Sequence, residues 1–83
     1  MKITIKYFAS IREAIGHGSA VHETGATTLA TLRDELIASS PEHADALARG
    51  KAVRLALNQV MTDEAAELTP GCEVAFFPPV TGG

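Results

Sequence analysis

A single long apolar stripe with helical spacing lies among segments whose apolar residues recur at every second position. Four residues form the stripe: Leu29, Leu32, Leu36 and Ile37. Thr28 stands where it can cap that helix, and Arg33 lies off the apolar stripe. Residues 2–8, 53–58 and 73–77 alternate apolar and polar, which is typical of strands with one buried face. One helix packed on one face of a small mixed sheet satisfies both patterns, so we expect an α+β fold.

The alternation also predicts which strand residues face the helix. Eight residues are expected on that face: Ile3, Ile5, Tyr7, Val53, Leu55, Leu57, Val74 and Phe76. The same alternation puts Phe8 and Phe77 on the opposite face, where the other residues of the first strand are polar. We therefore expect Phe77 to be largely exposed in the free chain.

Short signals between these segments predict further elements. Ser10 and Glu13 have the spacing of a capping box, which predicts a short helix over residues 10–15. Gly16 suits the end of that helix. Residues 19–24 predict a second strand.

Prolines mark the later boundaries. Ser40 is a suitable cap, and Pro41 fits the first position of a short helix that extends to about Gly50. Residues 69–71 carry the Pro-Gly pair of a type II turn. The prolines at 78–79 end the last strand, because neither can donate a ladder hydrogen bond.

Size and charge exclude several classes of function. The chain has 83 residues, which suits one domain over residues 1–83 with a C-terminal tail at 78–83. Seven basic and ten acidic side chains give a net charge of -3, which argues against nucleic acid as a partner. No apolar run approaches the roughly 20 residues that span a membrane, and the N-terminal alternation argues against a signal peptide. A single cysteine cannot form an intrachain disulfide, which favours a reducing, cytoplasmic compartment.

The isolated ligand-type residues are interpreted as structural. Cys72 is expected to be a small inert residue, and a persulfide on it is the less favoured alternative. His17, His22 and His43 lack metal-ligand spacing, so we expect no metal site. Three acidic residues form a cluster that is expected to be solvated: Asp63, Glu64 and Glu67.

The last eight residues, FFPPVTGG, are the most informative part of the chain. Pro78 and Pro79 stiffen the exit from the last strand into an extended path. Four residues follow, and their extended reach is roughly 13 Å. Gly82 and Gly83 lack a Cβ, so they suit a channel too narrow for other residues. We expect a thin thread that ends on a Gly83 carboxylate, which an enzyme can activate.

The ending GCEVAFFPPVTGG resembles that of the small subunits of molybdopterin synthase, and the similarity extends to YFASIREAIG and to LNQ at residues 57–59. The resemblance implies a ubiquitin-like β-grasp fold and a carrier function. An E1-like activating enzyme would use ATP to adenylate the carboxylate of Gly83, and a sulfur donor would then replace AMP to leave a thiocarboxylate. The large synthase subunit would receive the tail, and two such sulfurs would build the dithiolene on a pterin precursor.

The resemblance also implies which residues bind the partners. The positions of Phe8, Arg12, Met61 and Phe77 resemble the patch that docks the activating enzyme and the large subunit. Four tail residues would accompany this patch: Pro78, Pro79, Val80 and Thr81. Exposed aromatic residues with an arginine are common interface anchors, which supports the same interpretation. The chain itself would supply no acid, base, metal or bound cofactor, so the catalytic groups are expected on the large subunit.

Two alternatives share the Gly-Gly ending. A sulfur carrier for another pathway, such as thiamine synthesis, has the same fold, although the stretch FFPPVT argues against it. A ubiquitin-like modifier would join its terminus to a lysine through an amide. Mass spectrometry separates the carriers from the modifier, because a thiocarboxylate exchanges one oxygen for sulfur whereas a modifier is found as a conjugate on other proteins.

Overall fold

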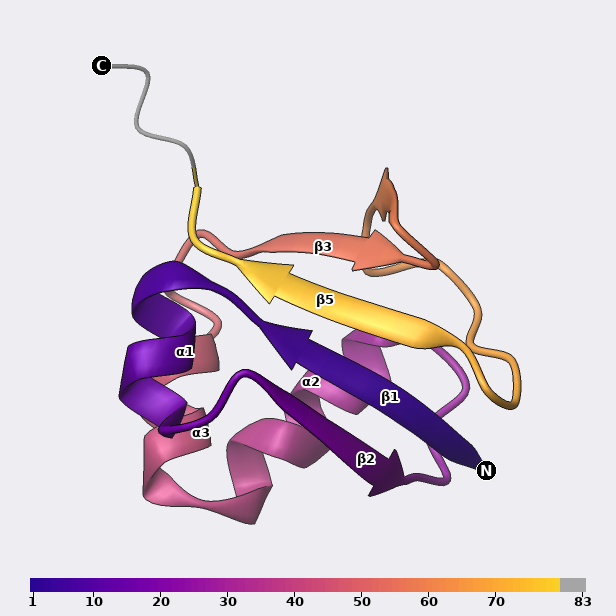
Figure 1. Ribbon diagram of the computed structural model, residues 1–83, viewed down its shortest axis with the longest axis horizontal. Helices are drawn as coiled ribbons and strands as arrows, with labels where there is room; N and C mark the ends of the chain where they lie inside the picture. Colours follow the sequence, from indigo (N-terminus) through magenta and orange to yellow (C-terminus); the bar gives the residue numbers. More distant parts are fainter. Residues whose placement is uncertain (80–83) are drawn as a thin grey trace.

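The computed structural model describes residues 1–79, which form a five-stranded sheet and three helices. The strands are β1 Lys2–Tyr7, β2 Ser19–Glu23, β3 Arg54–Leu57, β4 Val60–Thr62 and β5 Glu73–Phe77. The helices are α1 Ala9–Ile15, α2 Leu29–Ser39 and α3 Pro41–Leu47. Figure 1 shows the N-terminus of β1 and the end of β5 at opposite ends of the molecule. The expected α+β class is confirmed.

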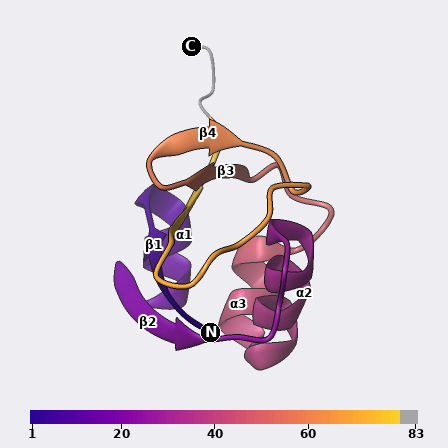
Figure 2. The same cartoon turned by 90° about the vertical axis from the view of Figure 1, so that its right-hand side faces the viewer.

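The strands of the sheet follow the order β2-β1-β5-β3-β4. β1 and β5 run parallel, with Ile5 opposite Val74. β2 pairs antiparallel with β1, while β3 pairs antiparallel with both β5 and β4. Figure 2 shows the sheet curving around α2 and α3, and no helix among residues 1–79 covers its other face. We call this uncovered side the open face.

The core lies between the sheet and the helices. Six of the eight residues predicted to face the helix are buried: Ile3, Ile5, Tyr7, Leu55, Val74 and Phe76. Val53 and Leu57 are half-buried and pack against the same cluster, as does Ile37. Three residues of the helical stripe are buried opposite the sheet: Leu29, Leu32 and Leu36. The alternation and the stripe therefore predict the core correctly.

The first helix, α1, begins earlier than the capping-box pattern predicts. Phe8 occupies the N-cap position and no side chain caps the helix, so the prediction that Ser10 is the cap is wrong. The sheet fixes the backbone of Phe8, because its N–H donates to Phe76 O at 3.2 Å and its carbonyl accepts from the Arg12 N–H at 3.3 Å. The helix therefore starts where β1 ends. Gly16 terminates it with a φ of 99°, as predicted.

Hydroxyl side chains cap the next two helices, as the sequence predicts. Thr28 accepts from the backbone N–H three residues further along, at 3.3 Å. Ser40 accepts from the His43 N–H at 3.1 Å and opens α3. The end of α3 differs from the prediction, because the helix stops at Leu47 and does not continue to about Gly50.

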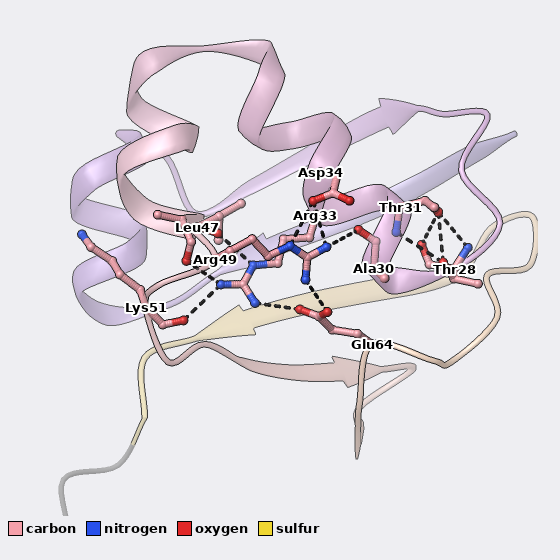
Figure 3. Close-up of polar contacts among 10 residues, drawn as sticks. Thr28, Ala30, Thr31, Arg33, Asp34, Leu47, Arg49, Lys51 and Glu64 are labelled. Atoms are coloured by element: carbon pink, nitrogen blue, oxygen red, sulfur yellow. Dashed lines mark hydrogen bonds and ion pairs between the residues drawn. The ribbon is translucent and has the colours of Figure 1, made fainter.

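Arg33 of α2 is buried, although the helical pattern places it off the apolar stripe (Figure 3). Its guanidinium donates to Leu47 O and Ala48 O at 2.8 Å each, and to Lys51 O at 3.1 Å. It also pairs with Glu64 at 2.7 Å. The carbonyls at the end of α3 thus bond to Arg33 and not to a further helical turn, which accounts for the early stop.

The expectation of a solvated acidic cluster is wrong for Glu64. Its carboxylate pairs with both Arg33 and Arg49, and Arg49 also pairs with Asp34 at 2.8 Å. Burial by itself would raise the pKa of Glu64, but hydrogen bonds from Arg49 and Arg33 hold that pKa below its ordinary value. Figure 3 shows these side chains gathered beside α2. They join α2, the loop after α3 and the segment after β4.

Two tight turns shape the sheet, and the sequence patterns predict one of them. Gly71 has a φ of 80° and the Cys72 N–H donates to Thr69 O at 3.1 Å, as expected for the type II turn before β5. Asn58 and Gln59, with φ of 50° and 68°, form an unpredicted hairpin turn between β3 and β4. The short strand β4 was missed because all three of its residues are exposed, so it carries no buried alternation.

Candidate functional site

Three of the residues expected to bind partners meet on the open face near the end of β5. Phe8 follows β1, Met61 lies in β4 and Phe77 ends β5. The rings of Phe8 and Phe77 stack with centroids 5.0 Å apart and an angle of 30° between their planes. Met61 lines the same hollow as both rings, with a volume of about 280 Å³. We call these three residues the open-face patch.

Two small residues leave room for this hollow. Ala56 of β3 and Ala75 of β5 are cross-strand partners, and both are buried beneath it. Lys6 and Glu73 border the hollow and form a salt bridge at 3.6 Å. The open-face patch is therefore an apolar depression with charges at its rim, which suits an apolar side chain from a partner.

Phe77 is half-buried, so the prediction that it is largely exposed is wrong. The ring of Phe8 stacks on it, while Phe8 itself is 41% exposed and Met61 is 54% exposed. The alternation nevertheless gives the correct face, because Val74 and Phe76 are fully buried on the other side of β5. Phe77 can therefore contribute both to folding and to a docking surface.

Arg12 stands apart from the open-face patch. It is exposed on α1, and its side chain runs past Gly18. A Cβ on Gly18 would lie 3.3 Å from Arg12 Cδ, so the glycine leaves room for the arginine stem. Arg12 does not line the open-face hollow. The structure thus brings together three of the four predicted anchors and leaves the fourth beside the segment that leads into β2.

The two prolines after β5 carry the chain away from the sheet near α1 (Figure 1). β5 ends at Phe77, as predicted, and Pro78 is half-buried while Pro79 is exposed. Both prolines line a groove of about 320 Å³ against α1, α3 and the loop before β3. Four predicted site residues lie outside the described part of the chain: Val80, Thr81, Gly82 and Gly83.

The ligand-type side chains of residues 1–79 are dispersed. No three His, Cys, Asp or Glu residues in this range are placed to hold a metal ion. Cys72 is buried in the core, at 3% exposure. His22 pairs with Glu35 at 2.7 Å. None of the helices described is long and apolar enough to cross a membrane.

A buried tyrosine links the sheet to α3. Tyr7 Oη lies 3.2 Å from His43 Nε2, and Ser40 Oγ lies 2.6 Å from His43 Nδ1. Burial raises the pKa of Tyr7 to about 12. Burial also lowers the pKa of His43, and the neighbouring His17 lowers it further. None of these groups lines the open-face hollow, so we interpret them as structural links.

The sequence patterns did not single out three polar residues that border the hollow: Lys6, Gln59 and Glu73. Alternation offered a signal for Lys6 and Glu73, because both stand on the strand face that carries Phe8 and Phe77. Gln59 could not be placed in this way, because its position depends on a hairpin that the patterns did not predict.

Comparison with known proteins identifies the family. A model described as the ThiS family matches residues 5–83. The chain belongs to the ThiS family. A relative from Escherichia coli (strain K12), named molybdopterin synthase sulfur carrier subunit, is 41% identical over 81 residues, which cover 98% of this chain and 99% of that protein. The resemblance to the small subunits of molybdopterin synthase is therefore confirmed.

Solved structures bear on the fold of this ThiS-family chain. SAMP1 from Haloferax volcanii aligns over 100% of both chains with a TM-score of 0.79 at 23% identity. A chain from the protein-protein complex of subunits 1 and 2 of molybdopterin-converting factor from Helicobacter pylori 26695 also aligns over 100% of both chains, with a TM-score of 0.70 at 24% identity. These likenesses confirm the β-grasp prediction.

Proposed function

We propose that this ThiS-family chain is the sulfur carrier subunit of molybdopterin synthase. The observation that carries the proposal is the full-length match, at 41% identity, to the E. coli relative of that name. The FFPPVTGG ending and the open-face patch beside the start of the tail support the same function. A carrier needs a stable fold, a docking surface and a reactive end, and this chain has candidates for all three.

In the proposed activation, the carboxylate of Gly83 attacks the α-phosphorus of ATP on an E1-like activating enzyme, and pyrophosphate leaves. The resulting acyl adenylate has an electrophilic carbonyl carbon. Hydrosulfide released by a sulfur donor attacks that carbon, AMP leaves with the electrons of the bond that breaks, and a thiocarboxylate remains on Gly83. The ionised sulfur is a soft nucleophile at neutral pH, as thiolates are. ATP belongs to the activating enzyme, and this chain binds no cofactor of its own.

In the proposed transfer, the large subunit receives the tail and supplies the acid and base groups. The thiocarboxylate sulfur attacks an oxygen-bearing carbon of a pterin precursor, and the bond from that carbon to oxygen breaks as the departing oxygen takes up a proton. The carrier is then joined to the precursor through a thioester. Water cleaves the bond between the carbonyl carbon and sulfur, which restores the carboxylate of Gly83 and leaves the sulfur on the precursor. Two such deliveries build the dithiolene of molybdopterin.

The open-face patch is the proposed docking surface for the large subunit and for the activating enzyme. Phe77 of this patch directly precedes the prolines that begin the tail, so a partner that covers the patch can also take in Gly83. The H. pylori protein of this fold was solved as a complex of subunits 1 and 2, which supports a large subunit as a partner. Arg12, which lies apart from this patch on α1, is proposed as a further contact with these partners. We place the chain in the cytoplasm.

The experiment that tests this function follows the mass of the intact chain. With its activating enzyme, ATP and a sulfur donor, the chain should exchange one oxygen for sulfur. Addition of the large subunit and the pterin precursor should restore the original mass and form the dithiolene. Amide conjugates on other proteins, without sulfur gain, would identify a ubiquitin-like modifier instead. Sulfur gain without transfer on the large subunit would indicate a carrier for another pathway, such as thiamine synthesis.

A further inference from the structure

A second depression lies at the base of the tail, on the helix side of the sheet. Its volume is about 320 Å³, and we call it the tail-base groove. α1 contributes Ile11 and Ala14, the loop before β3 contributes Lys51 and Val53, and Pro79 belongs to the tail. No residue lines both this groove and the open-face hollow, among the residues described. The tail therefore leaves the fold between two separate depressions.

One wall of the tail-base groove is held in place by the buried Arg33 (Figure 3). Its side chain is 6% exposed, and it donates to the carbonyls of Ala48 and Lys51 at 2.8 and 3.1 Å. The Lys51 N–H also donates to Ala48 O at 2.9 Å. A loop fixed by these bonds loses little conformational entropy when a partner binds, so the wall is preorganised for docking.

The lining of the groove combines small apolar side chains with a cation. Ala14 and Ala52 are exposed, and with the buried Ile11 they leave space for an apolar group. Lys51 is the one charged residue among those that line the groove in the described structure. Its ammonium lies 3.8 Å from Asp45, and these side chains are 54% and 80% exposed. So loose a surface pair leaves Lys51 able to bind a carboxylate from a partner.

The position of the groove points to one partner, and this step rests on the proposed sulfur-carrier function. In that function the reactive carbon belongs to Gly83, and four residues follow Pro79. They span at most about 13 Å. A large subunit that brings its catalytic groups to Gly83 must therefore reach within about 13 Å of Pro79, which itself lines the groove.

We propose that the tail-base groove is a second docking site for the large subunit, used together with the open-face patch. A segment of the large subunit seats an apolar side chain against Ile11 and Ala14 and sets a carboxylate beside Lys51. The start of the tail is then held from both sides of the sheet. Contacts on both sides fix the direction in which the prolines leave the fold. Contacts at the open-face patch alone would fix only the orientation of the sheet relative to the large subunit.

Two variants of the groove test this proposal against matched controls. Ala14→Trp fills the groove and Lys51→Glu reverses its charge. Ala38→Trp changes an exposed alanine on α2, and Lys2→Glu changes an exposed lysine at the start of β1. Calorimetric titration with the large subunit should show binding roughly tenfold weaker for each groove variant. The controls should stay within about twofold of the unmodified chain.

A neutral variant, Lys51→Met, covers the case in which Ala14→Trp fails to fold, which thermal melts would reveal. Its affinity for the large subunit should depend less on salt than that of the unmodified chain. Unchanged affinity and salt dependence in the groove variants would overturn the role of the groove as a docking site and leave the carrier function intact. Weaker binding to the activating enzyme alone would overturn the assignment to the large subunit. If the unmodified chain neither gains sulfur nor binds the large subunit, the proposed carrier function is overturned, and so is the docking role of the groove that rests on it.

Discussion

At the end of β5, two neighbouring phenylalanines face opposite sides of the sheet. Phe76 is fully buried in the core, where its ring stacks on Tyr7 with centroids 5.9 Å apart. Phe77 is half-buried on the open face, against Phe8. Because successive strand residues point to opposite faces, one position separates a residue of the core from a residue of the open-face patch.

Alanine at each of these two positions should separate stability from binding. Phe76→Ala should lower the free energy of unfolding by about 3–5 kcal/mol, as for a core aromatic residue. Phe77→Ala should cost about 1–2 kcal/mol, because part of its ring is already in water. The same change should weaken binding of the large subunit about thirtyfold, which corresponds to about 2 kcal/mol for an interface anchor. Denaturant unfolding and titration measure the two quantities; normal binding by Phe77→Ala would remove it from the docking surface.

The last residue should be decisive for sulfur transfer and irrelevant to folding. Deleting Gly83, or adding one residue after it, moves the proposed reactive carbon away from the catalytic groups of the partners. The core that the structure describes runs from Ile3 to Phe76, so we expect far-UV circular dichroism and the melting temperature to stay unchanged. Reconstituted synthase assays should then show no dithiolene. Normal activity from a chain extended by one residue would contradict the proposed chemistry.

Among the elements, polar contacts fix the loop that joins α3 to β3. Arg33 reaches from α2 to three carbonyls of that region and to Glu64, and no buried side-chain nitrogen or oxygen in the described chain lacks a hydrogen-bond partner. Such a buried cation is tolerated because its donors are satisfied. The same residue therefore terminates α3 and supports the wall of the tail-base groove.

Removal of this cation should be costly. Arg33→Ala removes the donor that three carbonyls of this loop share and leaves the Glu64 carboxylate with Arg49 alone, so we expect a loss of about 3–5 kcal/mol in the free energy of unfolding. Arg54→Ala is the matched control, because Arg54 is exposed on β3, and its cost should stay within about 0.5 kcal/mol. Denaturant unfolding of both variants measures the difference. Equal stability of the two variants would show that apolar packing alone holds the loop.

Across the whole molecule, the sequence predicts what depends on local periodicity and misses what depends on distant partners. Strand faces, the helical stripe and the hydroxyl caps follow from spacing within a few residues, and the structure agrees with them. The burial of Arg33 depends on carbonyls at least 14 residues away, which no local pattern contains. The start of α1 likewise depends on Phe76, which is distant in sequence and holds Phe8 in the sheet. The open-face patch was predicted through its residues, but its hollow depends on the β3–β4 hairpin.

Titratable side chains lie where the helices contact the sheet, so the free energy of unfolding of the whole fold should fall at acidic pH. The pKa of His43 lies below its ordinary value of 6.5, first because of burial and then because of His17, while Glu42 opposes the shift. The folded state therefore disfavours the charged imidazole, and the unfolded state binds more protons as the pH falls. This contribution to the free energy of unfolding is present above pH 6.5 and is lost as the pH falls through the pKa of the folded state.

We therefore expect the free energy of unfolding to decline in two stages on acidification. The first begins near pH 6.5 and belongs to His43, while the second begins near pH 4.5, where Glu35 and Glu64 have lowered pKa values that favour their paired, charged forms. His43→Gln keeps an amide that can bond to Tyr7 but cannot titrate, so the first stage should vanish and the second should remain. Denaturant unfolding at closely spaced pH values and constant ionic strength measures both stages. A first stage that persists in His43→Gln would contradict its assignment to His43.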